Sequence, residues 1–218
     1  MKTDYTHIAL VLDRSGSMAQ IRCDTIGGVN TFLKTQQEAP GECTFTLVQF
    51  DSTAIETIVD AQPVKSVAPL TEKTFVPRHN TPLYDAIGQT IDDTGRFLER
   101  LDEPIRSSKV IFVIVTDGLE NASQLFTALR VRQMIQHQTQ VYKWEFVFIG
   151  ANIDSYAVGQ NIGVVRGKTM NFASNSASVD SAFAALSENV LLCRVGKYHD
   201  TSFKKEQREA QRAAGAKE

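Results

Sequence analysis

The eight residues from Lys109 to Thr116 (KVIFVIVT) constrain the fold of this chain more than any other stretch. Their apolar side chains would point to both faces of a strand, as is typical of the central strands of a parallel sheet that helices cover on both sides. A second apolar run, Ile8 to Leu12, predicts another buried strand. Each run is followed at once by an aspartate. The sequence therefore predicts a helix-covered sheet with two acidic residues at strand ends.

The remaining periodicity alternates between strands and helices. Further strands are expected over 43–50, 53–59, 144–149 and 168–172, and helices over 18–37, 82–101, 123–137, 154–161 and 178–192. Only Asp51 and Ser52 separate two of the strands, so these two must form an antiparallel hairpin. This alternation predicts a three-layer α/β/α sandwich, doubly wound, with a mostly parallel sheet and one antiparallel edge strand.

One domain over residues 1–198 accounts for these elements. In the helix at 123–137, we expect Leu125, Leu129 and Ile135 to point inward. Residues 199–218 are rich in Lys, Glu, Arg, Gln and Ala, with no large apolar residue after Phe203. That composition predicts a charged and mobile C-terminal tail.

Composition narrows the class of protein. The formal net charge of -2 gives no general attraction to nucleic acid or to an anionic membrane. The three cysteines are widely spaced and odd in number, which favours a reducing compartment. There is no secretory signal pattern at the N-terminus and no apolar run long enough to cross a bilayer. We expect a cytoplasmic protein without a membrane partner.

Oxygen-bearing side chains follow the two buried strands. Asp13, Ser15 and Ser17 occupy alternate positions after the first, and Asp117 follows the second. Thr81 lies in the loop before the helix that begins near residue 82. Ligands of α/β sheets bind at the carboxyl ends of the strands, so these five residues are expected to meet there. Carboxylate and hydroxyl oxygens suit a hard cation such as Mg²⁺. The alternative is a purely structural role, in which Asp13 forms an Asx turn that caps the following helix.

Three segments carry a family resemblance: LVLDRSGSM, NTPLYDAIG and VIVTDG. They resemble the three segments that form the metal-ion-dependent adhesion site of von Willebrand factor type A (vWA) domains. The resemblance implies six strands in the order 3-2-1-4-5-6. It also implies a Mg²⁺ or Mn²⁺ ion held by Asp13, Ser15, Ser17, Thr81 and Asp117. An Asp or Glu carboxylate of a partner protein would complete the coordination of the ion. The expected function is thus metal-dependent protein binding without catalysis.

Loop residues beside these segments are candidates for partner contact. They are Arg14, His79, Asn80, Glu120 and Asn121, although such residues are often merely solvated. Asp85 could support the site from the first turn of its helix.

Two other functions remain open. A phosphohydrolase of the haloacid-dehalogenase type also places an aspartate after its first strand, where Asp13 stands, but usually has a carboxylate two residues on, where this chain has Ser15. The chain could instead be an accessory subunit of an AAA+ ATPase or of another multi-subunit complex, as intracellular proteins of this kind often are.

Overall fold

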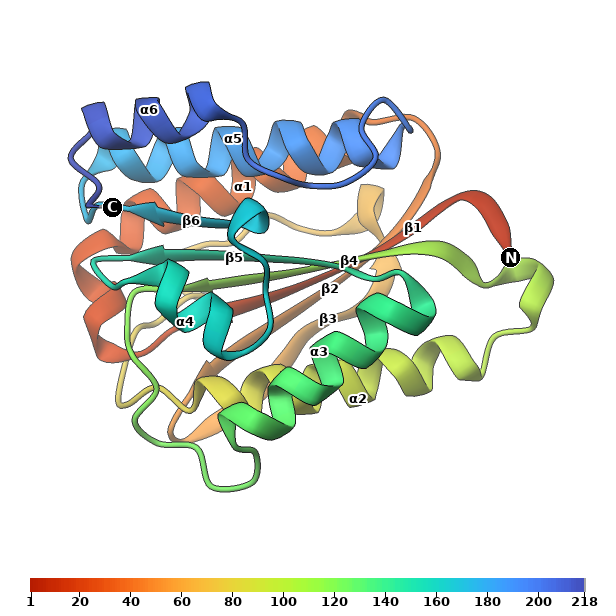
Figure 1. Ribbon diagram of the computed structural model, residues 1–218, viewed down its shortest axis with the longest axis horizontal. Coiled ribbons are helices and arrows are strands. Elements are labelled where there is room, and N and C mark those ends of the chain that lie inside the picture. Colours follow the sequence, from red (N-terminus) through yellow and green to blue (C-terminus); the bar gives the residue numbers. More distant parts are fainter. Residues whose placement is uncertain (218) are drawn as a thin grey trace.

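A computed structural model describes residues 1–217, which form a six-stranded sheet between two layers of helices (Figure 1). The strands are β1 (Lys2–Asp13), β2 (Glu42–Asp51), β3 (Ala54–Pro63), β4 (Ser107–Thr116), β5 (Glu145–Ala151) and β6 (Thr169–Phe172). Their order is β3-β2-β1-β4-β5-β6; β2 and β3 are antiparallel and the other neighbours are parallel. The predicted strand order and the antiparallel edge strand are confirmed.

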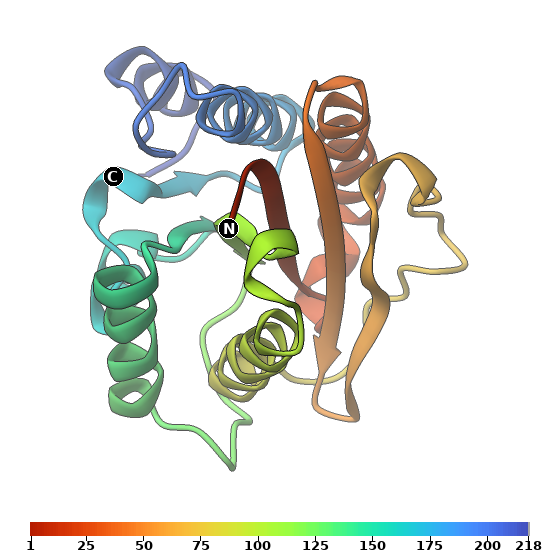
Figure 2. The same ribbon diagram turned by 90° about the vertical axis from the view of Figure 1, so that its right-hand side faces the viewer.

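Helices cover both faces of the sheet. The α-helices are α1 (Arg22–Glu38), α2 (Leu83–Glu99), α3 (Ala128–Tyr142), α4 (Ser155–Asn161), α5 (Ser176–Arg194) and α6 (Lys205–Ala213). Short 3₁₀ helices are η1 (Gly16–Ile21), η2 (Val64–Ser66), η3 (Glu103–Ile105) and η4 (Arg166–Lys168). Helices α1 and α5 lie on one face with α6 beside α5, whereas α2, α3 and α4 lie on the other (Figures 1 and 2).

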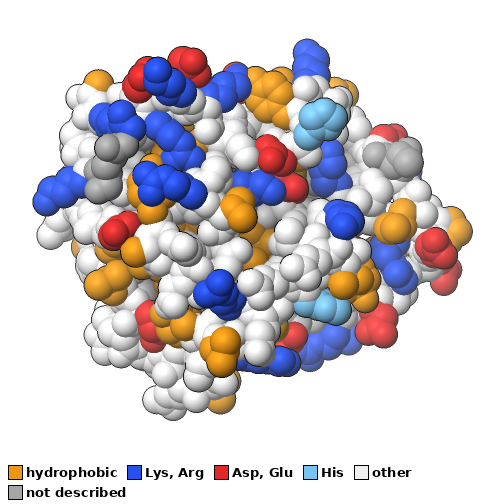
Figure 3. All heavy atoms as spheres, in the orientation of Figure 1, with side chains coloured by type: hydrophobic (Ala, Val, Ile, Leu, Met, Phe, Trp, Pro, Cys, Tyr) orange, Lys and Arg blue, Asp and Glu red, His pale blue; other side chains and the backbone are white. Residues whose placement is uncertain are grey.

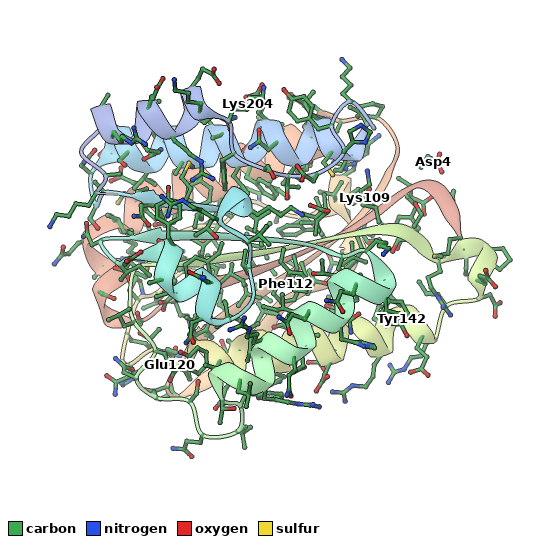
Figure 4. All side chains as sticks on the ribbon, in the orientation of Figure 1. Asp4, Lys109, Phe112, Glu120, Tyr142 and Lys204 are labelled. Carbon is green, nitrogen blue, oxygen red and sulfur yellow. The ribbon has the colours of Figure 1, made fainter. Side chains whose placement is uncertain are left out.

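Alternation along β1 divides the core in two. Ile8, Leu10 and Leu12 belong to the cluster under α1 and α5, whereas Ala9 and Val11 belong to the cluster under α2 and α3. The labelled Phe112 of β4 lies in this second cluster (Figure 4). All residues from Ile111 to Val115 are 0% exposed. Burial of each large side chain contributes about 1.5–3 kcal/mol, so the central strands are fixed by both layers.

Two glycines permit close helix contacts. A Cβ on Gly28 of α1 would lie 2.3 Å from the Phe183 ring of α5, and a Cβ on Gly88 of α2 would lie 2.4 Å from the Phe126 ring. Neither position has room for a side chain. The second contact anchors the loop between β4 and α3 against α2.

The prediction for α3 was wrong at its start. The helix begins at Ala128 and buries Val131, Met134 and Ile135, whereas Leu125 and Leu129 are 78% and 66% exposed. Residues before Ala128 do not enter the helix because side-chain carboxylates bind their backbone N–H groups, as described below for Asp85 and Glu120.

The C-terminal segment also differs from the prediction of a free tail. Thr201, Phe203 and Gln211 are buried, and α6 packs against α5 and β6. The Gln211 side chain accepts from the Ser178 hydroxyl at 2.6 Å and donates to the Ser178 carbonyl at 3.0 Å. Polar contacts of this kind leave no apolar stripe in the sequence, which is why periodicity did not reveal the packing.

Among residues 1–217, none of the helices combines the length and apolar character needed to span a bilayer.

Candidate metal site

The two aspartates that end the apolar strands lie at the same edge of the sheet. Strands β1 and β4 are parallel neighbours, and Leu12 is in register with Val115. Asp13 is 0% exposed. Its Oδ1 accepts a hydrogen bond from the Ser15 backbone N–H at 2.6 Å, and its Oδ2 accepts from the Thr116 hydroxyl at 2.6 Å. Asp13 therefore joins the turn after β1 to the end of β4.

The two serines connect Asp13 to Asp117. Ser15 Oγ lies 3.1 Å from Ser17 Oγ, and the Ser17 hydroxyl donates to Asp117 Oδ1 at 2.6 Å. Ser15 is buried, Ser17 is exposed and Asp117 is half-buried. The chain of contacts thus runs from the interior of the sheet edge to its surface.

Thr81 reaches the same place from a separate loop. A Cβ on Gly118 would lie 3.1 Å from Thr81 Oγ1 and 3.7 Å from Ser17 Oγ. Both hydroxyl oxygens therefore lie beside the residue that follows Asp117. The five residues that the sequence predicts as metal ligands therefore lie close together at this edge of the sheet, and metal binding by them stays a prediction.

Backbone hydrogen bonds hold the loop that carries Thr81. Gly16 N donates to the His79 carbonyl at 2.9 Å, and Arg78 N donates to the Arg14 carbonyl at 2.8 Å. Thr81 N donates to Asn121 Oδ1 at 2.8 Å. Three distant chain segments are therefore tied to one another around the site.

Two carboxylates shape the loop between β4 and α3. Asp85 accepts from the backbone N–H groups of residues 124, 125 and 126 at 2.7–2.9 Å. Glu120, labelled in Figure 4, accepts from the N–H groups of Tyr84, Ala122 and Ser123 and from the Ser123 hydroxyl at 2.7–2.9 Å. Asp85, in the first turn of α2, thus holds the loop that follows Asp117 and supports the candidate site in this way.

Only some of the five residues predicted to contact a partner are exposed beside the site. His79, Asn80 and Asn121 are exposed, although the Asn121 side chain also orders the Thr81 backbone. The oxygens of Glu120 are occupied by the loop. Arg14 does not lie on the rim: its side chain is 7% exposed and its Nε donates to Asp51 Oδ2 at 2.7 Å. Burial beside a carboxylate accounts for this inward orientation.

Burial has the largest effect on the pKa values of the two aspartates of the site. It raises the pKa of Asp13 to about 6 and also raises the pKa of Asp117. Within residues 1–217, no lysine, arginine or histidine forms an ion pair with either group. The same residues contain no cluster of three or more His, Cys, Asp or Glu side chains positioned to hold a metal. A cation here would depend on two carboxylates and three hydroxyls, which is a donor set suited to Mg²⁺ or Mn²⁺.

Sequence reasoning missed two residues that shape this site: Thr116 binds Asp13, and Gly118 leaves room for Thr81. It also missed Asp51, which turns Arg14 away from the rim. The position of Thr116 at the end of a buried strand, next to Asp117, was the one available signal. The partner of Arg14 could not be read from the sequence because it comes from a different strand.

Comparisons with known proteins identify the fold. No model of a known protein family matches the sequence, and no curated protein matches it significantly. Among solved structures, a von Willebrand factor type A protein from Catenulispora acidiphila is 12% identical with a TM-score of 0.56, over 87% of this chain and 43% of that one. Manganese-loaded TRAP from Plasmodium vivax is 13% identical with a TM-score of 0.54, over 84% and 74%.

The SpRpn10 VWA domain is 8% identical with a TM-score of 0.54, over 83% of this chain and 94% of that domain. The chain spans less than half the length of several matches, the Catenulispora protein among them. At these identities the likeness concerns the fold alone. The chain has a vWA-like α/β fold.

Proposed function

We propose that this protein is a non-enzymatic protein-binding module whose binding depends on a divalent cation. Asp13, Ser15, Ser17, Thr81 and Asp117 would hold Mg²⁺ or Mn²⁺ at the carboxyl edge of the sheet. The observation that carries this proposal is the pair of desolvated carboxylates, Asp13 and Asp117, that has hydroxyls around it and no basic partner within residues 1–217.

The donor set explains how such a site would recruit a partner. The formal charges of two carboxylates equal that of a divalent ion, but the other three ligands are neutral hydroxyls that bind weakly. The ion would therefore still attract an outside anion. When bound, the ion would supply a coordination position for an outside oxygen. Ser17 and the half-buried Asp117 lie at the surface, so a partner's Asp or Glu could approach from that side.

Structural relatives support this type of function. A pilus adhesin, SpaC from Lactobacillus rhamnosus GG, shares the fold with a TM-score of 0.58, and TRAP was solved loaded with manganese. The partner could equally be a subunit of a larger assembly, such as a complex with an AAA+ ATPase.

The geometry disfavours the phosphohydrolase alternative. Asp13 is fully buried, and both of its oxygens accept hydrogen bonds from the protein. A nucleophilic carboxylate must reach the phosphorus of its substrate. Asp13 would instead orient Ser15 and add its negative charge to the proposed ion site.

The metal is tested by titrating the purified protein with Mn²⁺ in a calorimeter. The parent should bind one ion, and Ser17→Ala or Thr81→Val should weaken binding by at least about tenfold. Thr31→Ala, which changes an exposed threonine on α1, should leave the affinity unchanged. A parent that binds no Mn²⁺, or Ser17→Ala and Thr81→Val proteins that bind it as the parent does, would contradict the proposal.

The carboxylate partner is tested with peptides selected from a random library on the Mn²⁺-loaded protein. The selected peptides should share an Asp or Glu, and each should lose binding when that residue becomes Asn or Gln, or when EDTA is added. Selected peptides that bind equally well in EDTA would refute the shared ion.

A further inference from the structure

Charge is distributed unevenly along this chain. Residues 121–179, which contain α3, β5, α4 and β6, include five basic residues and two acidic ones. The rest of the chain has 18 basic and 23 acidic residues, since the totals are 23 and 25. Residues 121–179 therefore carry a formal charge of +3 in a protein whose net charge is -2. Such segregation creates a local positive potential that the net charge does not reveal.

The two acidic residues of this segment are already occupied within the protein. Glu145 pairs with Lys168 at 2.7 Å and accepts from Thr201. Asp154 accepts from Ala157 N at 2.9 Å and so caps α4. Neither carboxylate neutralises the arginines of α3 or the arginine that follows α4.

A groove of about 410 Å³ lies in this basic segment, between α3 and α4. Its polar lining side chains are Arg132, Gln136, Tyr156, Gln160 and Arg166, and no Asp or Glu lines it. Within residues 1–217, no carboxylate lies within ion-pair distance of Arg132 or Arg166. The groove thus presents two guanidinium groups that have no carboxylate partner among residues 1–217, together with two amides.

Packing around the groove fixes its walls. Gly163 has a φ of +91°, and a Cβ there would lie 3.2 Å from Arg132 Cγ, so the chain after α4 lies against the stem of that arginine. Arg208 of α6 donates to the Tyr156 hydroxyl at 2.7 Å and to the Arg166 carbonyl at 2.9 Å. The groove is therefore formed by anchored elements. Figure 3 shows further basic side chains gathered over α6 at the upper left of this face.

We propose that this groove binds an acidic peptide segment of a partner protein, apart from the proposed ion site. The unpaired arginines would bind its carboxylates, and the glutamines would bind its backbone. Nucleic acid fits less well. Two arginines already lie over the Tyr156 ring, at 4.2 and 5.5 Å from its centroid, and single-stranded nucleic acid usually stacks its bases on free aromatic faces.

Hexaglutamate is the probe for this inference, titrated into the full chain at low ionic strength in EDTA. Binding should saturate and should shift the backbone amide NMR signals of Tyr156 and Gln160. The double variant Arg132→Gln/Arg166→Gln should bind at least about tenfold more weakly. The matched variant Lys34→Gln/Lys65→Gln removes the same charge from exposed positions of α1 and η2, and it should stay within about twofold of the parent.

Three results would overturn the inference. They are the absence of saturable binding by the parent, an equal loss in the two double variants, and tighter binding of a six-nucleotide oligothymidylate through the same arginines. Because EDTA is present throughout, the result is independent of whether the ion site exists.

Discussion

Two buried aspartates at the same edge of the sheet differ in whether basic side chains pair with them. Asp13 ends β1 and Asp51 ends the neighbouring β2, and both are almost fully buried. Asp51 accepts from Arg14 Nε at 2.7 Å and from Arg78 Nε at 2.9 Å. Asp13 accepts from hydroxyl and backbone N–H groups, and no basic side chain of residues 1–217 forms an ion pair with it. The protein provides a positive charge for one carboxylate and none for the other.

The pKa values follow this difference. Burial alone would raise the pKa of Asp51, but hydrogen bonds from Thr53, Arg78 and Arg14 outweigh it and lower the pKa. For Asp13, burial prevails and raises the pKa to about 6. An aspartate that is compensated from within is a structural element. One without a basic partner leaves a negative charge that the proposed cation would balance.

The largest expected effect comes from removing the compensation of Asp51. Arg14→Ala leaves a buried carboxylate without its closest charge partner and should lower the free energy of unfolding by about 3–5 kcal/mol. Urea denaturation at pH 7 measures this loss. Arg78→Ala is the control, because the Arg78 side chain is 44% exposed and its removal should cost much less. Equal losses in the two variants would contradict the view that the burial of an ion pair determines how much it contributes to stability.

A smaller effect is expected at His7, a third buried ionisable group, which also lies on β1. Burial lowers its pKa to about 4, its Nδ1 lies 2.9 Å from Thr44 Oγ1, and its Nε2 has no partner within residues 1–217. Two carboxylates, Asp60 of β3 and Asp93 of α2, line the same small cavity of about 30 Å³ as His7.

Because the folded state favours the neutral imidazole, its contribution to stability is complete above pH 6.5. It is lost as the pH falls from about 6.5 to about 4 and amounts to about 3 kcal/mol. Urea denaturation across this range measures the loss, and His7→Gln should flatten the pH dependence. An unchanged slope in that variant would mean that other groups cause the acid sensitivity.

The smallest expected effect is that of Asp13→Asn without metal. The asparagine oxygen can still accept from Ser15 N. The Thr116 hydroxyl can accept from the new amide and donate instead to the Gly118 carbonyl, which lies 3.1 Å from it in the parent. The free energy of unfolding should therefore change by no more than about 1 kcal/mol. The corresponding change at Asp51 should cost far more. A loss of several kcal/mol in Asp13→Asn would show that Asp13 is as structural as Asp51.

Much of this fold was predictable because its central strands are apolar on both faces. The same strand ends led to the five residues that converge, since parallel strands place their carboxyl ends together. Arg14 and Glu120 were misjudged because a charged residue in a loop resembles a solvated one until its partner is known. The start of α3 was missed because Asp85, 39 positions before Gln124, competes for the N–H groups that a helix would use. The packing of α6 depends on glutamines, which carry no periodic signal.

The loop that carries Thr81 has one further consequence. Its backbone is fastened to the turn after β1, to the β2–β3 turn through Ser52 and Asn80, and to the segment after β4 through Asn121. None of these anchors exists until strands distant in sequence have paired. Nascent or partly unfolded chains would then lack the proposed ion site, and only molecules that have completed their tertiary structure would bind the proposed ion and partner.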